Sequence, residues 1–153
     1  MKKLKRIFNE IFIDGLGGMA YGLFATLIIG TIIQQVGNLV PGTVGSYIFM
    51  MGKMAAAVTG AGIGCGTAVK FKESPLVVLS AAATGMVGAF AGKIIAGTVL
   101  VEGAIVLAGP GEPLGAFIAA LAGIYVGRLV SGRTKVDILV TPFACIVAGS
   151  AVG

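Results

Sequence analysis

Long apolar stretches separated by short polar connections dominate this chain of 153 residues. Hydrophobic residues make up 57% of it and charged residues only 11%, which is about half the charge that soluble domains carry. A soluble fold would expose far too much apolar surface, so we expect an all-α, polytopic transmembrane helical bundle. Crossing a hydrocarbon core of about 30 Å takes about 20 helical residues. About five spans are predicted, at residues 16–36, 47–69, 75–101, 113–130 and 136–153.

The N-terminus differs from the spans because it carries the only dense basic cluster, Lys2, Lys3, Lys5 and Arg6. Apolar residues recur behind it at helical spacing, which predicts an amphipathic lead-in helix. We therefore expect a cytoplasmic lead-in over residues 1–15 and a transmembrane domain over 16–153. The basic cluster is typical of contact with anionic membrane lipids. Because the basic residues do not spread along a face with aromatic partners, no nucleic-acid partner is expected.

The charges of the connections predict the orientation. Basic residues occur at the N-terminus and in the second and fourth connections, whereas the first and third connections have none. Because basic loops remain in the cytoplasm, this alternation predicts a multi-pass protein with a cytoplasmic N-terminus and an external GPGEP turn. Arg128, Arg133 and Lys135 are interpreted as determinants of this topology.

Glycine is abundant, with 26 residues, and is regularly spaced. Small residues four apart occur at Gly18/Gly22, Gly88/Gly92, Gly123/Gly127 and Gly149/Gly153. Such pairs let helix backbones approach closely in lipid, so close packing is the favoured interpretation. Broken or re-entrant helices, which transporters use at binding sites, are the alternative.

Polar side chains inside or beside the predicted spans gather on the external side. They are Gln34, Gln35, Asn38, Lys53, Lys93, Glu102 and Glu112. Ionisable residues within spans are costly and tend to be functional, so this set is the predicted substrate-binding site. Its amide, carboxylate and ammonium groups suit a neutral polyhydroxy ligand such as a sugar.

Three of these four charged residues also have a simpler interpretation. Lys53 and Lys93 could extend to the interface and pair with a loop glutamate, which is slightly favoured for either lysine alone. Glu112 precedes Pro113 at the expected start of a helix, where a carboxylate stabilises the helix dipole.

Catalytic and metal-binding chemistry finds little support in the sequence. Histidine is absent, and Cys65 and Cys145 lie in apolar stretches without metal-ligand spacing. The GAGIGCG run lacks the Lys-Ser/Thr that a nucleotide phosphate loop requires. We therefore expect no catalytic residues, no metal and no cofactor.

Three stretches of the chain resemble the second family of phosphotransferase-system enzyme IIC-like membrane proteins, which includes the perfringolysin-regulator-like proteins. They are FIDGLGGMAYGLFATLIIGTIIQQVG, TGAGIGCGTAVKFKESPLVVLSAAATGMVGAFAG and GPGEPLGAFIAALAGIYVGR. The resemblance covers the chain from about Phe8 onward. Members of this family are about twice as long, so the resemblance implies the N-terminal half of a longer domain.

The resemblance also implies a function. It implies a permease that binds a sugar and moves it across the bacterial inner membrane, as part of a phosphoenolpyruvate-dependent phosphotransferase system. Soluble IIB and IIA phosphocarrier proteins are the implied partners, and a homo-oligomer is expected. The alternative is a membrane regulator or scaffold of the same fold that transports nothing. A small homo-oligomeric channel is the least favoured option, because no span shows a polar stripe.

Overall fold

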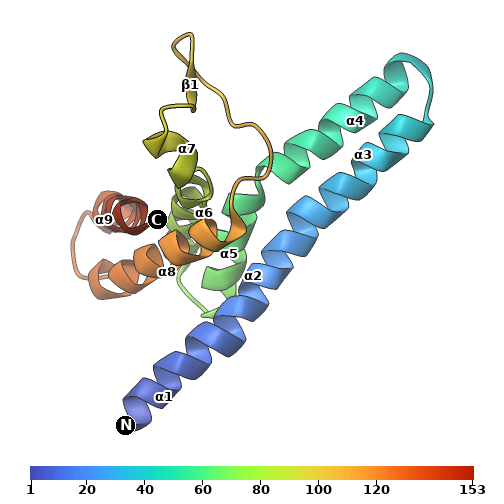
Figure 1. Cartoon of the computed structure of the whole chain (residues 1–153). Helices are drawn as coiled ribbons and strands as arrows, with labels where there is room; N and C mark the ends of the chain where they lie inside the picture. Colours follow the sequence, from blue (N-terminus) through green and yellow to red (C-terminus); the bar gives the residue numbers. More distant parts are fainter.

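The computed structural model describes residues 1–153, and helices form nearly all of its regular structure (Figure 1). The predicted all-α class is confirmed, apart from one short β-hairpin. In the element names, η marks a π-helical segment. The elements are α1 (Lys2–Asn9), η1 (Glu10–Gly15), α2 (Leu16–Leu23), η2 (Phe24–Ile28), α3 (Ile29–Leu39), α4 (Gly42–Ala57), α5 (Thr59–Lys70), α6 (Pro75–Ala89), α7 (Ala91–Ile95), β1 (Leu100–Val101), β2 (Ala104–Ile105), α8 (Pro113–Val130) and α9 (Asp137–Val152).

The first five elements form one continuous helix, Lys2–Leu39, of 38 residues. At 1.5 Å per residue it is about 57 Å long, which exceeds the thickness of a hydrocarbon core. The predicted lead-in helix and the predicted first span are therefore parts of the same rod. In the π-helical segment η2, the Thr26 hydroxyl donates to the Gly22 carbonyl at 2.6 Å, a side-chain bond that competes with regular helical pairing.

Five membrane spans are not confirmed. Only Lys2–Leu39 and Pro113–Val130 are long and apolar enough alone, and α4 with α5 makes a third candidate that is bent by 50° at Val58. Helices α6 and α9 have 15 and 16 residues, which corresponds to only about 22–24 Å. The bent pair shows that a broken helix, the less favoured glycine interpretation, does occur in this chain.

The predicted third span over residues 75–101 was wrong as a single helix. Helix α6 ends at Ala89, because Phe90 leaves helical geometry with φ −111° and ψ 8°. The chain then turns through Gly97 and Gly103, whose φ angles are +70° and +80°. Glycine adopts this left-handed region without steric cost, whereas hydropathy takes no account of it. The apolar residues on either side of the turn at Gly103 pair as the antiparallel hairpin β1–β2.

Helices cross at glycines with their backbones in direct contact. A Cβ atom added to Gly22 of α2 would lie 2.3 Å from the carbonyl oxygen of Gly62 in α5. A Cβ atom at Gly64 of α5 would lie 2.0 Å from the carbonyl oxygen of Ala81 in α6, and Gly88 of α6 meets α8 in the same way. Close packing therefore holds α2, α5, α6 and α8 together, as small residues permit in lipid.

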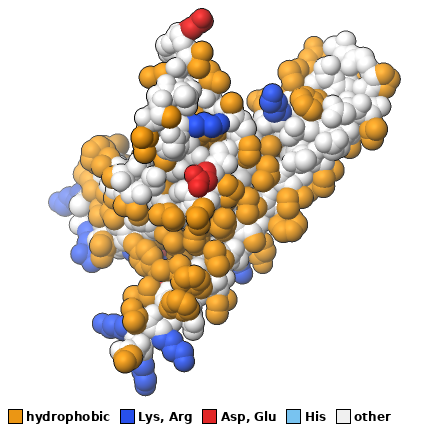
Figure 2. Space-filling view, viewed as in Figure 1, with side chains coloured by type: hydrophobic (Ala, Val, Ile, Leu, Met, Phe, Trp, Pro, Cys, Tyr) orange, Lys and Arg blue, Asp and Glu red, His pale blue; other side chains and the backbone are white.

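Buried apolar side chains pack between the same helices. Two small buried clusters lie between α5, α6 and α8, and α9 packs against α6 and α8. The α3–α4 hairpin extends away from this body (Figure 1). Apolar side chains cover much of the visible outer surface (Figure 2), which suits a lipid environment.

We predict that Gly22→Ala will destabilise the protein, because the added methyl group would overlap the α5 backbone. The expected loss in the free energy of unfolding is about 1–3 kcal/mol. Gly92→Ala is the matched control, since nothing lies within 4 Å of a Cβ atom there. Thermal unfolding in detergent measures both variants. Equal melting temperatures for the two would contradict the packing described here.

Candidate functional site

Polar side chains gather at the two ends of the antiparallel pair α6–α8. At one end, the C-terminus of α6 meets the N-terminus of α8. At the other end, the C-terminal turn of α8 meets the connection between α5 and α6. The helices between these ends are joined mainly by glycine, alanine and threonine. Two candidate sites therefore lie about one helix length apart.

The first site is built by the GPGEP turn, which folds back onto the end of α6. The backbone N–H of Glu112 donates to the carbonyl oxygen of Ala89 at 2.7 Å. Gly111 has φ +75°, and a Cβ atom there would lie 2.6 Å from the same oxygen. A glycine is thus required both for the backbone conformation and for the close approach.

An open pocket of about 460 Å³ results, which we call the Lys93–Glu112 pocket. It is lined by Ala89, Gly92, Lys93, Ala108, Pro110, Gly111, Glu112 and Pro113. The Lys93 ammonium donates to the Ala108 carbonyl oxygen at 2.7 Å and lies 5.4 Å from the centre of the Phe90 ring. The pocket offers an ammonium donor, a carboxylate acceptor and backbone carbonyls within a small space.

The structure also bears on the simpler interpretations of Lys53, Lys93 and Glu112. Neither Lys53 nor Lys93 forms an ion pair with a loop glutamate. Glu112 does stand at the N-cap of α8, but its side chain makes no capping hydrogen bond. Glu112 is exposed and lines the Lys93–Glu112 pocket.

The other predicted site residues lie elsewhere. Gln34, Gln35 and Asn38 belong to α3 and Lys53 to α4, so they sit on the α3–α4 hairpin. Asn38 lines a second pocket, of about 400 Å³, near the turn of that hairpin. Glu102 is exposed in the β1–β2 turn with φ +50°. The structure thus brings Lys93 and Glu112 together, and one site formed by all seven residues stays a prediction.

The second site was not predicted from the sequence. Arg128 of α8 forms ion pairs with Glu10 of the first helix and with Glu73 of the α5–α6 connection. Its guanidinium also lies 5.1 Å from the ring centres of both Phe71 and Tyr125. We call these five residues the Arg128 cluster. Arginine suits this position because its planar fork can bind two carboxylates and stack on rings at once.

The Arg128 cluster is partly shielded from solvent. The side chain of Glu73 is 10% exposed, and those of Glu10 and Arg128 are 25% and 29% exposed. The Tyr125 hydroxyl lies 3.4 Å from the second Glu10 carboxylate oxygen, to which it donates. The interpretation of Arg128 as a topology determinant missed these contacts. The one local signal was the spacing of Tyr125 and Arg128, which places both on one face of a helix.

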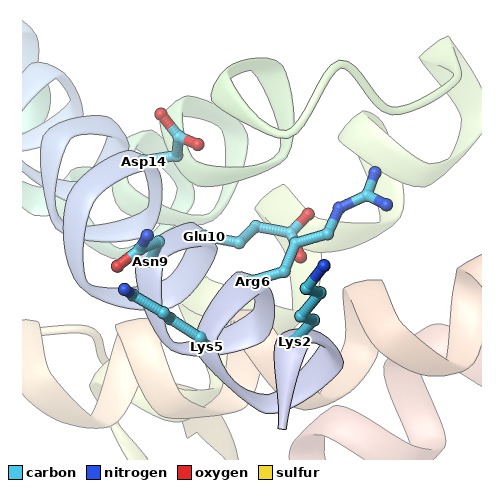
Figure 3. A pocket seen from close by; sticks show the side chains of 6 residues that line it. All are labelled: Lys2, Lys5, Arg6, Asn9, Glu10 and Asp14. Atoms are coloured by element: carbon cyan, nitrogen blue, oxygen red, sulfur yellow. The ribbon is translucent and has the colours of Figure 1, made fainter.

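Further polar groups surround the Glu10 side of this cluster. They line a shallow depression on the first helix and are Lys2, Lys5, Arg6, Asn9, Glu10 and Asp14. Figure 3 shows Glu10 on the side of the helix that carries Arg6 and Lys2, with Lys5 and Asn9 on the other side. Most of the Lys and Arg side chains visible in Figure 2 gather at this end of the molecule. No group of three His, Cys, Asp or Glu side chains is placed to hold a metal ion.

A glycine-packed helical bundle with apolar outer surfaces and polar clusters at its ends defines a polytopic membrane protein. Its family follows from a comparison with known families, in which residues 13–153 match the phosphotransferase system EIIC family. The chain therefore belongs to that family and is a membrane component of a phosphotransferase system. This confirms the resemblance seen in the sequence. No curated protein and no solved structure matches the chain.

We predict that Arg128→Ala will lower the free energy of unfolding by about 2 kcal/mol, since it leaves two partly buried carboxylates without their cation. Arg133→Ala is the matched control, because Arg133 is exposed on the α8–α9 connection and forms no ion pair. Thermal unfolding in detergent distinguishes them. A loss no greater for Arg128→Ala than for Arg133→Ala would show that the cluster contributes little.

Proposed function

We propose that this chain is the permease component of a phosphoenolpyruvate-dependent sugar phosphotransferase system. It would bind a sugar and translocate it across the bacterial inner membrane. The family match over residues 13–153 is the observation that carries this proposal. The Lys93–Glu112 pocket supports it, because a hydrophilic ligand needs polar partners when it enters an otherwise apolar bundle.

The chemistry of the pocket suits a polyhydroxy ligand. Each sugar hydroxyl both donates and accepts hydrogen bonds, and the pocket supplies an ammonium donor at Lys93 and a carboxylate acceptor at Glu112. Pro110 and Pro113 add rigid walls. The other predicted residues remain part of the proposal as further contacts along the path: Gln34, Gln35, Asn38, Lys53 and Glu102.

The orientation belongs to the same proposal. The end that holds the N-terminus and the α8–α9 connection is the most basic in view (Figure 2), and basic ends face the cytoplasm. The β1–β2 hairpin lies away from that end (Figure 1) and would face the outside. Soluble IIB and IIA partners would then approach the basic end, and anionic lipids would contact α1.

Sugar binding tests the proposed site. We predict that a panel of monosaccharides, assayed by thermal shift and confirmed by calorimetry, will contain at least one ligand for the purified protein. Lys93→Ala and Glu112→Gln should each weaken its affinity by about tenfold, the effect of losing one charged hydrogen bond. Lys135→Ala serves as the matched control, because Lys135 is exposed outside the pocket.

The outcomes of this assay separate the site from the function. If both pocket variants kept the sugar affinity of the original protein, the sugar site would not be the Lys93–Glu112 pocket. The affinities of Gln34→Ala and Glu102→Gln would then show whether the other predicted residues form the site. If a folded protein bound no sugar of the panel, the permease proposal would fail and a regulator or scaffold would remain.

The orientation has its own prediction. Single cysteines at Lys3→Cys and Glu102→Cys, in a protein carrying Cys65→Ala and Cys145→Ala, should react differently with a membrane-impermeant maleimide. We expect labelling in intact cells at position 102 only, and labelling at position 3 after the membrane is permeabilised. The reverse pattern would place the N-terminus outside.

A further inference from the structure

The ion pairs of the Arg128 cluster are the only ones in the molecule, and both involve a single guanidinium. They tie together three segments that are distant in sequence: the first helix, the α5–α6 connection and the end of α8. The cluster lies at the end of α6–α8 opposite the Lys93–Glu112 pocket.

We infer that Arg128 is the positioning residue of a cytoplasmic gate, which closes the end of the bundle through which substrate must leave. The inference rests on the proposed function and deepens it. The Lys93–Glu112 pocket is open, whereas ion pairs hold the opposite end of α6–α8 together. Within this proposal, that arrangement is assigned to the outward-facing state. Alternating access requires that the closed end open after the open end has closed.

Closely packed side chains lie behind the ion pairs of the Arg128 cluster. Behind the ion pairs, the Phe71 and Phe117 rings approach Gly15 of the first helix, since a Cβ atom there would lie 3.1–3.4 Å from them. Deeper still lies a fully enclosed cluster that includes Ala68 and Ile124, both 0% exposed. We therefore expect this packing to exclude water from position 68 while Arg128 holds its partners.

The two carboxylates of the Arg128 cluster belong to backbone segments with irregular conformations. Glu10 begins η1, a π-helical segment, and such segments interrupt regular helix pairing and occur often at functional sites. Lys72, next to Glu73, is a non-glycine residue with φ +58°, a conformation that costs energy and persists only when surrounding contacts hold it. Partial exposure lets water replace the lost partners of the carboxylates. Both carboxylates, those of Glu10 and Glu73, therefore belong to segments that can change conformation.

A buried cysteine reports the opening directly. Ala68 is suitable because it is fully buried and its carbonyl oxygen accepts the Glu73 backbone N–H at 3.1 Å. The experiment uses Ala68→Cys in the full chain with Cys65→Ala and Cys145→Ala, purified in lipid nanodiscs. The rate of reaction with a water-soluble maleimide measures how often water reaches this position.

We expect Arg128→Gln to raise the labelling rate by about tenfold or more, which corresponds to the loss of one charged hydrogen bond. Arg128→Lys keeps the charge but not the fork, so its rate should be intermediate. Arg133→Gln at the same end should leave the rate unchanged. Equal rates for Arg128→Gln and Arg133→Gln would overturn the gate. So would an equal rise at Ala116→Cys, which is fully buried near the opposite end of α8 and reports general loosening of the bundle.

Two further variants keep the test decisive if Arg128→Gln does not fold. Glu10→Gln and Glu73→Gln each remove one ion pair of Arg128, and each should raise the labelling rate. Unchanged rates in both would overturn the inference. Labelling requires no sugar, so faster labelling in a protein that binds no sugar would show that Arg128 closes this end of the bundle and would reject the permease. Sugar binding with unchanged labelling would retain the permease and reject the gate.

Discussion

Direct backbone contact at glycines determines how the rest of this molecule is arranged. In lipid, apolar side chains gain little by leaving their surroundings, so helices associate through close van der Waals contact. Gly22, Gly64 and Gly88 provide that contact between α2, α5, α6 and α8. Because α6 and α8 are locked side by side and antiparallel, the two polar sites at their ends are held at a fixed separation.

Charged side chains that can bind a ligand lie at the helix ends. Inside the bundle, each polar group needs a hydrogen-bond partner within the protein, because lipid offers none. Most buried hydroxyls find one in a backbone carbonyl nearby in the chain, although the Ser150 hydroxyl has no partner. Thr67 donates to the Ile63 carbonyl at 2.8 Å, and Thr84 donates to the Ser80 carbonyl at 2.7 Å. Groups free to bind a ligand or to form ion pairs therefore occur where the helices end. The Lys93–Glu112 pocket and the Arg128 cluster are the two places where this happens on α6–α8.

The sequence predicted those properties that depend on local composition. Hydropathy predicted apolar helices, and glycine spacing predicted their close contacts, although Gly92 proved to be open. Properties that depend on tertiary structure could not be predicted. Glu10 and Arg128 are 118 residues apart in the chain, and the hairpin after α7 depends on glycine φ angles. Lys93 and Glu112 were both candidate residues, but only the fold of the GPGEP turn places them in one pocket.

Phosphoenolpyruvate-dependent accumulation of sugar tests the central claim most directly. The assay uses bacterial cells that retain the soluble phosphocarriers but lack their own permease for each sugar of a labelled panel. The permease account predicts that producing this protein restores uptake of at least one sugar, recovered inside as its phosphate ester. No uptake of any sugar, with the folded protein present in the membrane, would contradict it.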